Sequence, residues 1–561
     1  MPESLFEKYD AGGWGWKMDG CQDAYPKHIP EYVEDRERRR RQFAVPRRSR
    51  RSFQTGSRYI VILLVGAMTF VLASAGHARA AGAYQVKIDW HHVNVVSKAS
   101  PTLQVVVNPL LRPSSPVSRR SLRAVKQLGA NYVRFVPWLP YPRLAVAELQ
   151  PPSHGRTHWN FSLIDPMVRA FMRATRGHSV IMNFSTIPEW LFTTAKPVPY
   201  PQNPNQVYWG YEQGTQLRNK SLKPLANYYA RLVSWYTRGG FRDEYGHWHH
   251  SGYHYHFAWW EVLNEVNFEH HMSVQEYTRW YDAITAAIHR VSPGTQFVGL
   301  ALANGQASGN IGWFKYFLNP AHHVAGTPLD MISFHFYAST GGRNQAVWSR
   351  NVFSQARGFI NESARIIALR DRLSPKTMID TDEIGVFLPG DNTRAKPLPV
   401  PRAYWNLSGA MFAYVYARLA ALGVNVVGES QLIGYPTQFP SVTMVNWHTG
   451  VPNARFRVLE LLIHHLGPGD KFCTTSVSAV GGQSVGQGVF AQALTTPTGQ
   501  HLVLVVNKAN RNYSVSIPHA KRGVAYYVDE QTGSHQPGKK TLTDGRMTLR
   551  PWEVAVVSVQ R

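Results

Sequence analysis

Eight short strand-like segments alternate with eight helix-like segments between residues 100 and 468. The strand-like segments are apolar and rich in β-branched and aromatic residues, which is typical of strands buried on both faces of a parallel sheet. Eight such units predict a (β/α)8 TIM barrel with long loops. The expected strands are 103–107, 132–136, 179–184, 259–265, 296–300, 331–337, 377–383 and 424–428, and the expected helices are 118–128, 163–174, 222–237, 273–290, 311–318, 351–372, 403–422 and 454–466.

The texture of the sequence changes after Gly467. Its strand-like segments are then separated by Gly, Pro, Asn and Ser and lie at 489–494, 502–507, 524–528 and 554–559. This spacing predicts an antiparallel β-sandwich domain over residues 469–561, which follows a barrel at 100–468. Residues 84–96 are also strand-like, and they either join this β-domain or open the barrel.

Residues 1–80 have the character of an export segment. Residues 49–53 (SRRSF) resemble a twin-arginine export signal, an uncharged apolar run follows at 59–75, and residues 78–80 (ARA) fit a cleavage site. The apolar run is short for a transmembrane helix and long for a signal core, so an uncleaved inner-membrane anchor is the alternative to a signal peptide. We expect an exported protein, periplasmic or extracellular.

The chain is strongly basic, with a formal net charge of +25. A basic surface favours acidic glycans or an anionic cell envelope, and a basic surface with no specific partner is an equal alternative. No helix-turn-helix, zinc-finger or RNA-binding signature accompanies the charge, so we expect no nucleic-acid partner. Cleavage of the export segment would remove Cys21 and leave Cys473 as a single thiol, with no internal disulfide.

Two of the expected strands end in a carboxyl side chain. The run 259–267 (WWEVLNEVN) delivers Asn264 and Glu265 at the end of the fourth strand, and a second run delivers Glu383 at the end of the seventh. The C-terminal ends of barrel strands form the active face of such a fold. Because glycoside hydrolysis needs two carboxyl groups that flank the sugar bond, the sequence predicts Glu265 and Glu383 as a catalytic pair.

These motifs resemble those of a known clan of enzymes. The run WWEVLNEVN, with residues 335–337 (HFY) on the sixth strand and 382–383 (DE) on the seventh, is similar to the signature of retaining glycoside hydrolases with (β/α)8 barrels. Within that clan, VLNEVN looks most like glycoside hydrolase family 39, the family of β-xylosidases and α-iduronidases. The resemblance spans about residues 100–468, and the expected terminal sandwich agrees with the family's accessory domain.

The resemblance implies a role for each motif residue. Glu265 would be the general acid/base and Glu383 the nucleophile, while Asn264 would hydrogen-bond the sugar 2-hydroxyl. Arg134, at the end of the second strand, would keep the nucleophile ionised, because a nearby cation lowers a carboxyl pKa. The residues that would line the sugar subsite or touch the nucleophile are His335 and Tyr337.

The chain departs from the family pattern at two places. Val266 stands where family members usually have Pro. The eighth strand runs into residues 429–431 (ESQ) where the clan commonly places a Trp platform, and Tyr435 and Trp447 follow further on. These departures put the sugar specificity and the catalytic competence in question, but not the fold. The endo or exo mode and the oligomeric state also stay open.

Other ionisable residues have competing interpretations. Glu261 is expected to be a buried, hydrogen-bonded barrel carboxylate, and Asp382, which alternates with Asp380 along its strand, is the alternative to Glu383 as the working acid. A cluster of histidines suggests a metal site, but its alternation with Trp and Tyr lacks the HExxH pattern. We therefore expect these histidines to line the cleft, and we expect no metal and no cofactor. They are His247, His249, His250, His254 and His256, with His270 and His271 beyond.

Together these features predict an exported retaining glycoside hydrolase that acts on an oligo- or polysaccharide with β-linked pentosides or related sugars. Three alternatives stay open. A transglycosylase would use the same site, and a metal-dependent hydrolase would use the histidines. A catalytically inactive glycan-binding barrel at the cell envelope would show a carboxyl separation outside both catalytic ranges, or a cleft blocked by residues 188–222.

Overall fold

The computed structural model describes residues 82–560 except for 195–197, 199, 210, 212–215, 304–309, 391–398, 437 and 481–487. The expected export segment at 1–80 lies outside these described residues. Within the described residues, no helix combines the length and the apolar character needed to cross a membrane.

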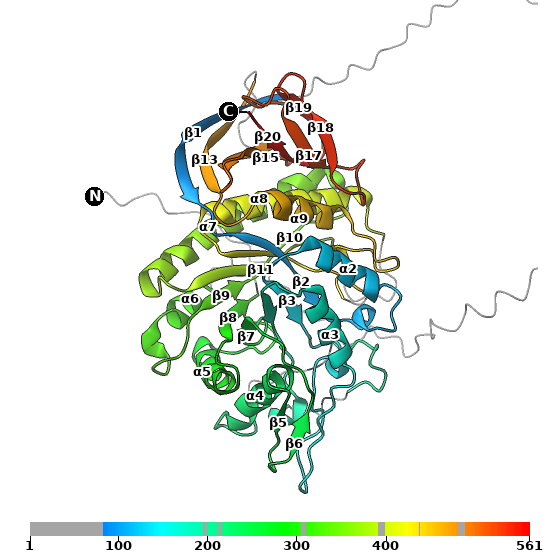
Figure 1. Ribbon diagram of the computed structural model, residues 1–561, viewed down its shortest axis with the longest axis vertical. Helices are drawn as coiled ribbons and strands as arrows, with labels where there is room; N and C mark the ends of the chain where they lie inside the picture. The colour runs from blue at the N-terminus through cyan, green and yellow to red at the C-terminus, as the bar shows by residue number, and fades with distance from the viewer. Residues whose placement is uncertain are drawn as a thin grey trace, which may run out of the picture. The chain divides into compact units, whose positions relative to one another are not determined.

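Nine parallel strands fill the eight positions of a closed barrel (Figure 1). The strands are β2 (Ser100–Val106), β3 (Val133–Val136), β4 (Val180–Met182), β7 (Trp259–Glu261), β8 (Gln296–Leu302), β9 (Met331–Phe334), β10 (Phe336–Ser339), β11 (Met378–Phe387) and β12 (Val426–Glu429). The short strands β9 and β10 flank His335 and together occupy the sixth position. Each position pairs with the next along the chain, and β12 returns to pair with β2. The predicted (β/α)8 barrel is confirmed.

A helix follows each barrel strand, and Figure 1 shows α2 to α7 around the strands. The helices are α2 (Ser118–Leu128), α3 (Asp165–Ala174), α4 (Lys223–Thr237), α5 (Val274–Val291), α6 (Ile311–Phe317), α7 (Gln345–Leu373), α8 (Arg402–Ala421) and α9 (Ala454–His465). Helix α2 ends at Gly129, whose φ of 64° is a conformation that glycine adopts at little cost. Helix α7 begins before the expected residue 351, because the Asn344 side chain accepts a hydrogen bond from the Ala346 amide and caps the helix there.

The inside of the barrel contains charged side chains. Arg134, Glu261, Asp380 and Asp382 are each at most 1% exposed. Charged residues are seldom fully buried unless they are paired. These four charged side chains come from strands β3, β7 and β11.

A second sheet of nine strands contains both ends of the described chain. Its strands are β1 (Gly82–Val96), β13 (Lys471–Ala479), β14 (Val489–Thr495), β15 (His501–Asn507), β16 (Tyr513–Ser516), β17 (Val524–Val528), β18 (Gly538–Thr541), β19 (Arg546–Leu549) and β20 (Val554–Ser558). Strand β1 lies inside the sheet, antiparallel to β13 and parallel to β16. The strand-like residues 84–96 therefore belong to this β-domain. It has its own apolar core, which includes the free thiol of Cys473.

Helices α8 and α9 contact the barrel and this second sheet. They touch β2, β11 and β12 on one side and β15, β17 and β20 on the other. The Trp552 indole also donates a hydrogen bond to Ser349 Oγ on α7 at 2.9 Å. The β-domain thus packs on the outside of the barrel helices, and it contributes none of the strands that carry the candidate site.

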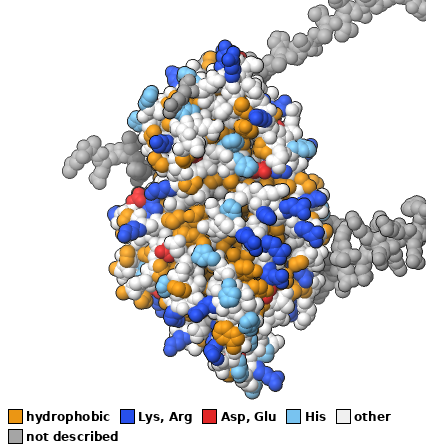
Figure 2. Space-filling model, in the orientation of Figure 1, with side chains coloured by type: hydrophobic (Ala, Val, Ile, Leu, Met, Phe, Trp, Pro, Cys, Tyr) orange, Lys and Arg blue, Asp and Glu red, His pale blue; other side chains and the backbone are white. Residues whose placement is uncertain are grey.

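The surface is basic, as the composition requires. The chain has 60 Lys and Arg against 35 Asp and Glu. Figure 2 shows Lys and Arg spread over the face in view, with few Asp or Glu. Five of the acids are instead buried on the barrel strands, namely Glu261, Asp380, Asp382, Glu383 and Glu429.

Candidate active site

Glu265 lies in the loop that follows β7. This strand ends at Glu261 and not at Glu265 as expected, because Leu263 and Glu265 have φ values of 65° and 41°. These left-handed conformations are incompatible with a strand and uncommon outside glycine. The Glu265 backbone N–H donates to the Ala301 carbonyl at 2.8 Å, which fixes the loop against β8. The strained loop presents the Glu265 side chain with 17% of its surface exposed.

Glu383 faces Glu265 from β11. One carboxyl oxygen of Glu265, one of Glu383 and one ring nitrogen of His335 all lie within 4.8 Å of one another. His335 Nδ1 is 2.9 Å from Glu265 Oε1 and 3.6 Å from Glu383 Oε2. In retaining glycosidases the two carboxyl groups are about 5–5.5 Å apart, whereas inverting enzymes need a wider gap. The arrangement therefore fits a retaining pair.

Arg134, on β3, ties the pair to the buried acids. Its Nη1 donates to Glu383 Oε1 at 2.5 Å, and its Nη2 donates to Asn264 Oδ1 at 2.6 Å. Its Nε donates to Glu261 and lies 2.9 Å from Asp382 Oδ2. Although burial opposes the charge, these carboxylates raise the pKa of Arg134, so the guanidinium is a fixed cation at the centre of the site.

A closed ring of hydrogen bonds holds Glu383. The Tyr337 hydroxyl lies 2.7 Å from Glu383 Oε2 and 2.6 Å from Ser430 Oγ. The Gln104 amide donates to Ser430 Oγ at 2.7 Å, and Gln104 Oε1 accepts from Arg134 at 2.8 Å. Since a phenol carries one proton, Ser430 donates to Tyr337 and Tyr337 donates to Glu383. Sequence reasoning missed Gln104 and Ser430, because they meet only when the first and eighth strands become neighbours.

The buried acids beneath the pair have pKa values that are shifted in different directions. Burial raises the pKa of Glu261 to about 7, and burial with the nearby Asp382 raises the pKa of Asp380 well above its ordinary value. Although burial opposes its ionisation, Arg134 and His335 hold the pKa of Asp382 well below its usual range. Asp382 is thus a buried counter-ion of Arg134, whereas Glu383 is the acid that reaches Glu265.

His335 sits between the two candidate catalytic carboxyls. Although burial favours the neutral ring, Glu383, Asp382 and Glu265 raise the pKa of His335 well above its ordinary value. The ring is fully buried, with Nδ1 toward Glu265 and Nε2 3.4 Å from Asp382 Oδ1. A proton on Nδ1 therefore lies within hydrogen-bond distance of Glu265.

A third glutamate joins the site. Glu269 Oε1 accepts a hydrogen bond from Asn264 Nδ2 at 2.9 Å and another from the Trp138 indole. Burial and the neighbouring Glu265 raise the pKa of Glu269 to about 8. Sequence reasoning missed Glu269. The signal was its position four residues after Glu265, because the loop forms a turn in which the Glu269 amide donates to the Glu265 carbonyl at 2.7 Å.

The eighth strand supplies an ion pair where the clan pattern has Trp. Glu429 Oε1 accepts from Arg455 Nε of α9 at 2.8 Å, and both side chains are fully buried. Burial raises the pKa of Glu429 to about 7, while Arg455 lowers it. Of the aromatic residues further on, Tyr435 packs against Tyr141.

The histidines between 247 and 256 do not line this site. They lie in and after a separate hairpin, β5 (Gly240–Arg242) and β6 (Trp248–His250), where His249 Nε2 is 2.9 Å from Asp243 Oδ2. Although burial opposes it, His249 and backbone amides lower the pKa of Asp243 to about 2. Of the cluster expected to line the cleft, His247 and His249 instead pair with Asp243 on this hairpin, where Phe241 packs edge-on against Trp159. His270 is fully buried, and burial lowers its pKa to about 3. Among the described residues, Glu265, His335 and Glu383 form the one group of three whose geometry could hold a metal ion.

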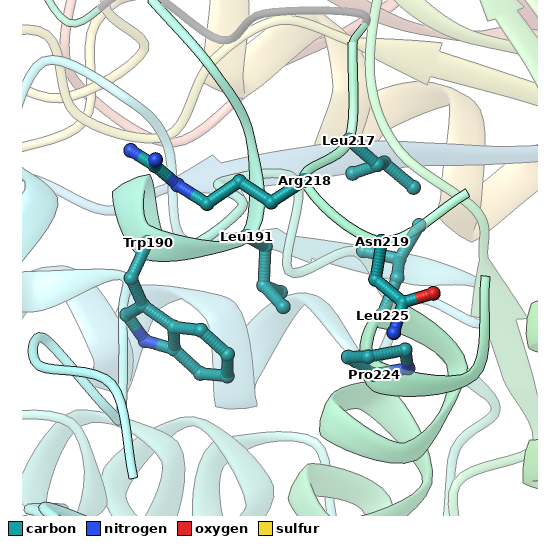
Figure 3. A pocket seen from close by; sticks show the side chains of 7 residues that line it. All are labelled: Trp190, Leu191, Leu217, Arg218, Asn219, Pro224 and Leu225. Carbon is teal, nitrogen blue, oxygen red and sulfur yellow. The ribbon is translucent and has the colours of Figure 1, made fainter. Parts of the chain in front are cut away.

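A small cavity lies apart from Glu265 and Glu383. Figure 3 shows it between the turn at Trp190 and the start of α4, with a volume of about 100 Å³. Its lining is Trp190, Leu191, Leu217, Arg218, Asn219, Pro224 and Leu225. None of the carboxyl groups described above borders it, so it is a packing gap beneath the loop after β4.

Sequence comparisons do not identify this chain. No protein-family model matches it. No curated protein matches it either.

Solved structures match the fold. A GH51 alpha-L-arabinofuranosidase from Thermotoga petrophila RKU-1 has a TM-score of 0.58 at 14% identity, covering 85% of this chain and 100% of that one. A GH30 endoxylanase from Clostridium papyrosolvens C71 has a TM-score of 0.50 at 12% identity, with the same coverages. A conserved exported protein from Bacteroides fragilis has a TM-score of 0.54 at 13% identity, again covering 85% and 100%.

At these identities the likeness shows a shared fold. GH51 and GH30 are families of clan GH-A, retaining glycoside hydrolases with (β/α)8 barrels, and the GH51 fold also carries a C-terminal β-domain. Neither is family 39.

Proposed function

We propose that the chain is a retaining glycoside hydrolase. The observation that carries this proposal is a pair of carboxyls, Glu265 in the loop after β7 and Glu383 within β11, with oxygens within 4.8 Å of each other. Two carboxyls at this spacing suit double displacement, because there is no room for a water molecule and a sugar ring between them.

In the first step a Glu383 oxygen attacks the anomeric carbon as the bond to the leaving oxygen breaks. Glu265 gives its proton to that oxygen, and a glycosyl ester on Glu383 results. In the second step a water oxygen attacks the same carbon, its proton passes to Glu265, and Glu383 leaves as the carboxylate. Between the steps Glu265 is a carboxylate, and His335 Nδ1, 2.9 Å from Glu265 Oε1, is placed to donate a hydrogen bond to it.

The surrounding residues orient the reacting groups. Arg134 and Tyr337 each hold one oxygen of Glu383, which aims the carboxylate and balances its charge. The Asn264 amide has two hydrogens. One is donated to Glu269, and the other is free to bind the sugar 2-hydroxyl, a contact that strengthens in the transition state.

The proposed substrate is an oligo- or polysaccharide with pentose units. The support is the motif resemblance to family 39, which includes β-xylosidases, and the fold shared with an arabinofuranosidase and an endoxylanase. We further propose that the chain is exported, on the strength of the twin-arginine-like residues 49–53. A described neighbour is itself called an exported protein.

A screen of nitrophenyl glycosides followed by nucleophile rescue tests the proposal. Glu383→Ala should lower turnover of the best substrate by about a thousandfold or more. Azide should partly restore it, because the anion fits the space of the lost carboxylate and attacks the same carbon. Asp382→Ala is the matched control: it removes a neighbouring acid, and azide should not rescue it. Wild-type turnover in Glu383→Ala would show that Glu383 is not the nucleophile. Azide rescue of Asp382→Ala alone would identify Asp382 as the nucleophile instead.

Product analysis separates hydrolysis from transfer. With a sugar acceptor in excess, a hydrolase should release mainly free sugar, whereas a transglycosylase on the same site should build longer products. Binding of oligosaccharides without any turnover would instead support an inactive glycan-binding barrel.

A further inference from the structure

Five aromatic side chains form a continuous series beside the candidate site. Tyr337 stacks on Phe387 with ring centroids 4.4 Å apart, and Phe387 meets Phe439 at 5.1 Å. Phe439 then contacts Trp209 edge-on at 5.7 Å, and Trp209 contacts Trp138 edge-on at 5.3 Å. We call Tyr337, Phe387, Phe439, Trp209 and Trp138 the aromatic arc. All five are half-buried, so each keeps some exposed surface despite these contacts.

Both ends of the arc are fastened next to the catalytic carboxyls. At one end the Tyr337 hydroxyl donates to Glu383 Oε2 at 2.7 Å. At the other end the Trp138 indole donates to Glu269, and the same Glu269 oxygen accepts from Asn264, the neighbour of Glu265 in the chain. The arc therefore runs from the proposed nucleophile round to the side of the proposed acid/base.

The arc is assembled from loops at the C-terminal face of the barrel. Trp138 follows β3, Trp209 lies in the loop after β4, Phe387 ends β11 and Phe439 follows β12. The loops after β3 and β4 are joined by a hydrogen bond from the Tyr208 amide to the Pro140 carbonyl at 2.8 Å. The five rings thus come from five separate segments of the chain.

The backbone of Phe439 is in a strained conformation. Its φ of 43° and ψ of 65° are left-handed, a conformation that is a genuine outlier for a bulky side chain. Strain of this kind persists where the surrounding structure demands it, and it clusters at ligand sites.

We propose that the aromatic arc is a second ring-binding subsite, which holds the leaving-group part of a glycoside whose cleaved sugar lies over Glu383. The proposal rests on the proposed hydrolase function and deepens it. The occupant is a ring with an apolar face, a further sugar of an oligosaccharide or an aryl aglycone, because aromatic side chains pack against such faces. The substrate then extends at least one ring beyond the sugar that is attacked.

The choice of leaving group tests the arc separately from the catalytic pair. A glycosyl fluoride has no leaving-group ring, a nitrophenyl glycoside has an aromatic one, and an oligosaccharide has a sugar there. Xylosyl fluoride, nitrophenyl β-xyloside and xylotriose would be compared in wild type, Trp209→Ala and Phe439→Leu. The matched control is Trp248→Ala, because Trp248 is 53% exposed on the β5–β6 hairpin away from the arc.

We expect the arc variants to lower kcat/KM for nitrophenyl β-xyloside and xylotriose about tenfold, equivalent to about 1.4 kcal/mol. Hydrolysis of xylosyl fluoride should change far less, and Trp248→Ala should change none of the three. Equal losses on fluoride and ring-bearing substrates would overturn the proposal, because they would indicate a general structural defect. A loss on nitrophenyl β-xyloside alone would assign the subsite to aryl aglycones, and a loss on xylotriose alone would assign it to sugars.

A binding measurement keeps the result independent of turnover. Titration of wild type with xylotetraose, cellotetraose and arabinotetraose should change the tryptophan fluorescence for at least one of them, and Trp209→Ala should lose most of that change. Binding without hydrolysis would support the arc and refute the proposed function. Hydrolysis of xylosyl fluoride by wild type, with no effect of the arc variants on any substrate, would support the proposed function and refute the arc. No response of wild type to any of the three would overturn the arc.

Discussion

Glu269 is a carboxyl residue whose environment opposes its charge. One of its oxygens accepts two hydrogen bonds, while the other is buried without a hydrogen-bond partner among the described residues. Burial and Glu265 raise the pKa of this group to about 8. The folded protein therefore keeps a proton on Glu269 at neutral pH, whereas the unfolded chain loses it near pH 4.5.

This difference predicts how Glu269→Gln changes stability with pH. A raised folded pKa means that the stability of wild type falls as the pH rises from about 4.5 to about 8, because only the folded state still binds the proton. Glutamine keeps the acceptor for Trp138 and Asn264 but does not titrate. The Tm of Glu269→Gln relative to wild type should thus rise between pH 5 and pH 8. The corresponding difference in the free energy of unfolding grows by at most about 1.4 kcal/mol per pH unit.

Thermal unfolding at four or five pH values checks this expectation. Glu530→Gln, at an exposed position of the β-domain, serves as the control and should show no trend. A Tm difference for Glu269→Gln that is flat across the range would mean that Glu269 is ionised in the folded protein, and the interpretation of the third carboxyl would have to be abandoned.

A buried ion pair joins β12 to α9, and burial raises the pKa of its carboxyl as it does that of Glu269. Arg455 pairs with Glu429 inside the molecule and also donates to the carbonyls of Val442 and Ser430. It thereby holds the loop after β12, which includes Ser430 of the ring around Glu383. Removal of one partner from a buried pair leaves an uncompensated charge, which costs about 3–5 kcal/mol.

Arg455→Met should therefore destabilise the protein strongly, and more at pH 8 than at pH 5. The folded pKa of Glu429 is already raised to about 7 with its partner present. Without the guanidinium it rises further, so stability continues to fall as the pH passes through 7. Urea unfolding at the two pH values measures the effect. The double variant Glu429→Gln with Arg455→Met should recover part of the loss, and a double variant as unstable as the single one would contradict the explanation.

At the scale of the whole molecule, strand β1 begins the described chain and pairs with strands that follow the barrel. It lies between β13 and β16, so its removal would expose the backbone groups of both strands and part of the second apolar core. Unpaired strand edges and exposed apolar faces lead to aggregation.

A chain that begins at residue 82 should fold as the longer one does, whereas a chain that begins at residue 97 should not form a stable β-domain. Limited proteolysis is the measurement, with cleavage expected first in 471–558 of the shorter chain. Equal protease resistance of the two chains would show that β1 is dispensable.

Periodicity was enough to predict the barrel and the order of its strands. Alternating apolar segments fix which residues face the core, and this pattern is local, so it is legible in the chain itself. The Asn264-Glu265 and Asp382-Glu383 motifs were visible for the same reason. The bounds of strands were less accurate: β7 ends at Glu261 because of the left-handed residues that follow, and no pattern of polarity reports a backbone angle.

The tertiary structure decided which side chains meet. Gln104 and Ser430 are 326 residues apart and touch because the barrel closes its first strand on its eighth. The histidines at 247–256 were misplaced because a dense cluster suggests a site, whereas a hairpin anchored outside the barrel removes it from the cleft. Trp209 and Phe439 come from the loops after β4 and β12, and they meet only through packing in the folded chain. Charge states such as that of Glu269 also depend on burial, a property of the folded molecule and not of the residue. The sequence by itself determined the barrel and the catalytic candidates, because both follow from local pattern. Only the folded chain decided their partners, their protons and their aromatic surroundings, because these depend on contacts between distant segments.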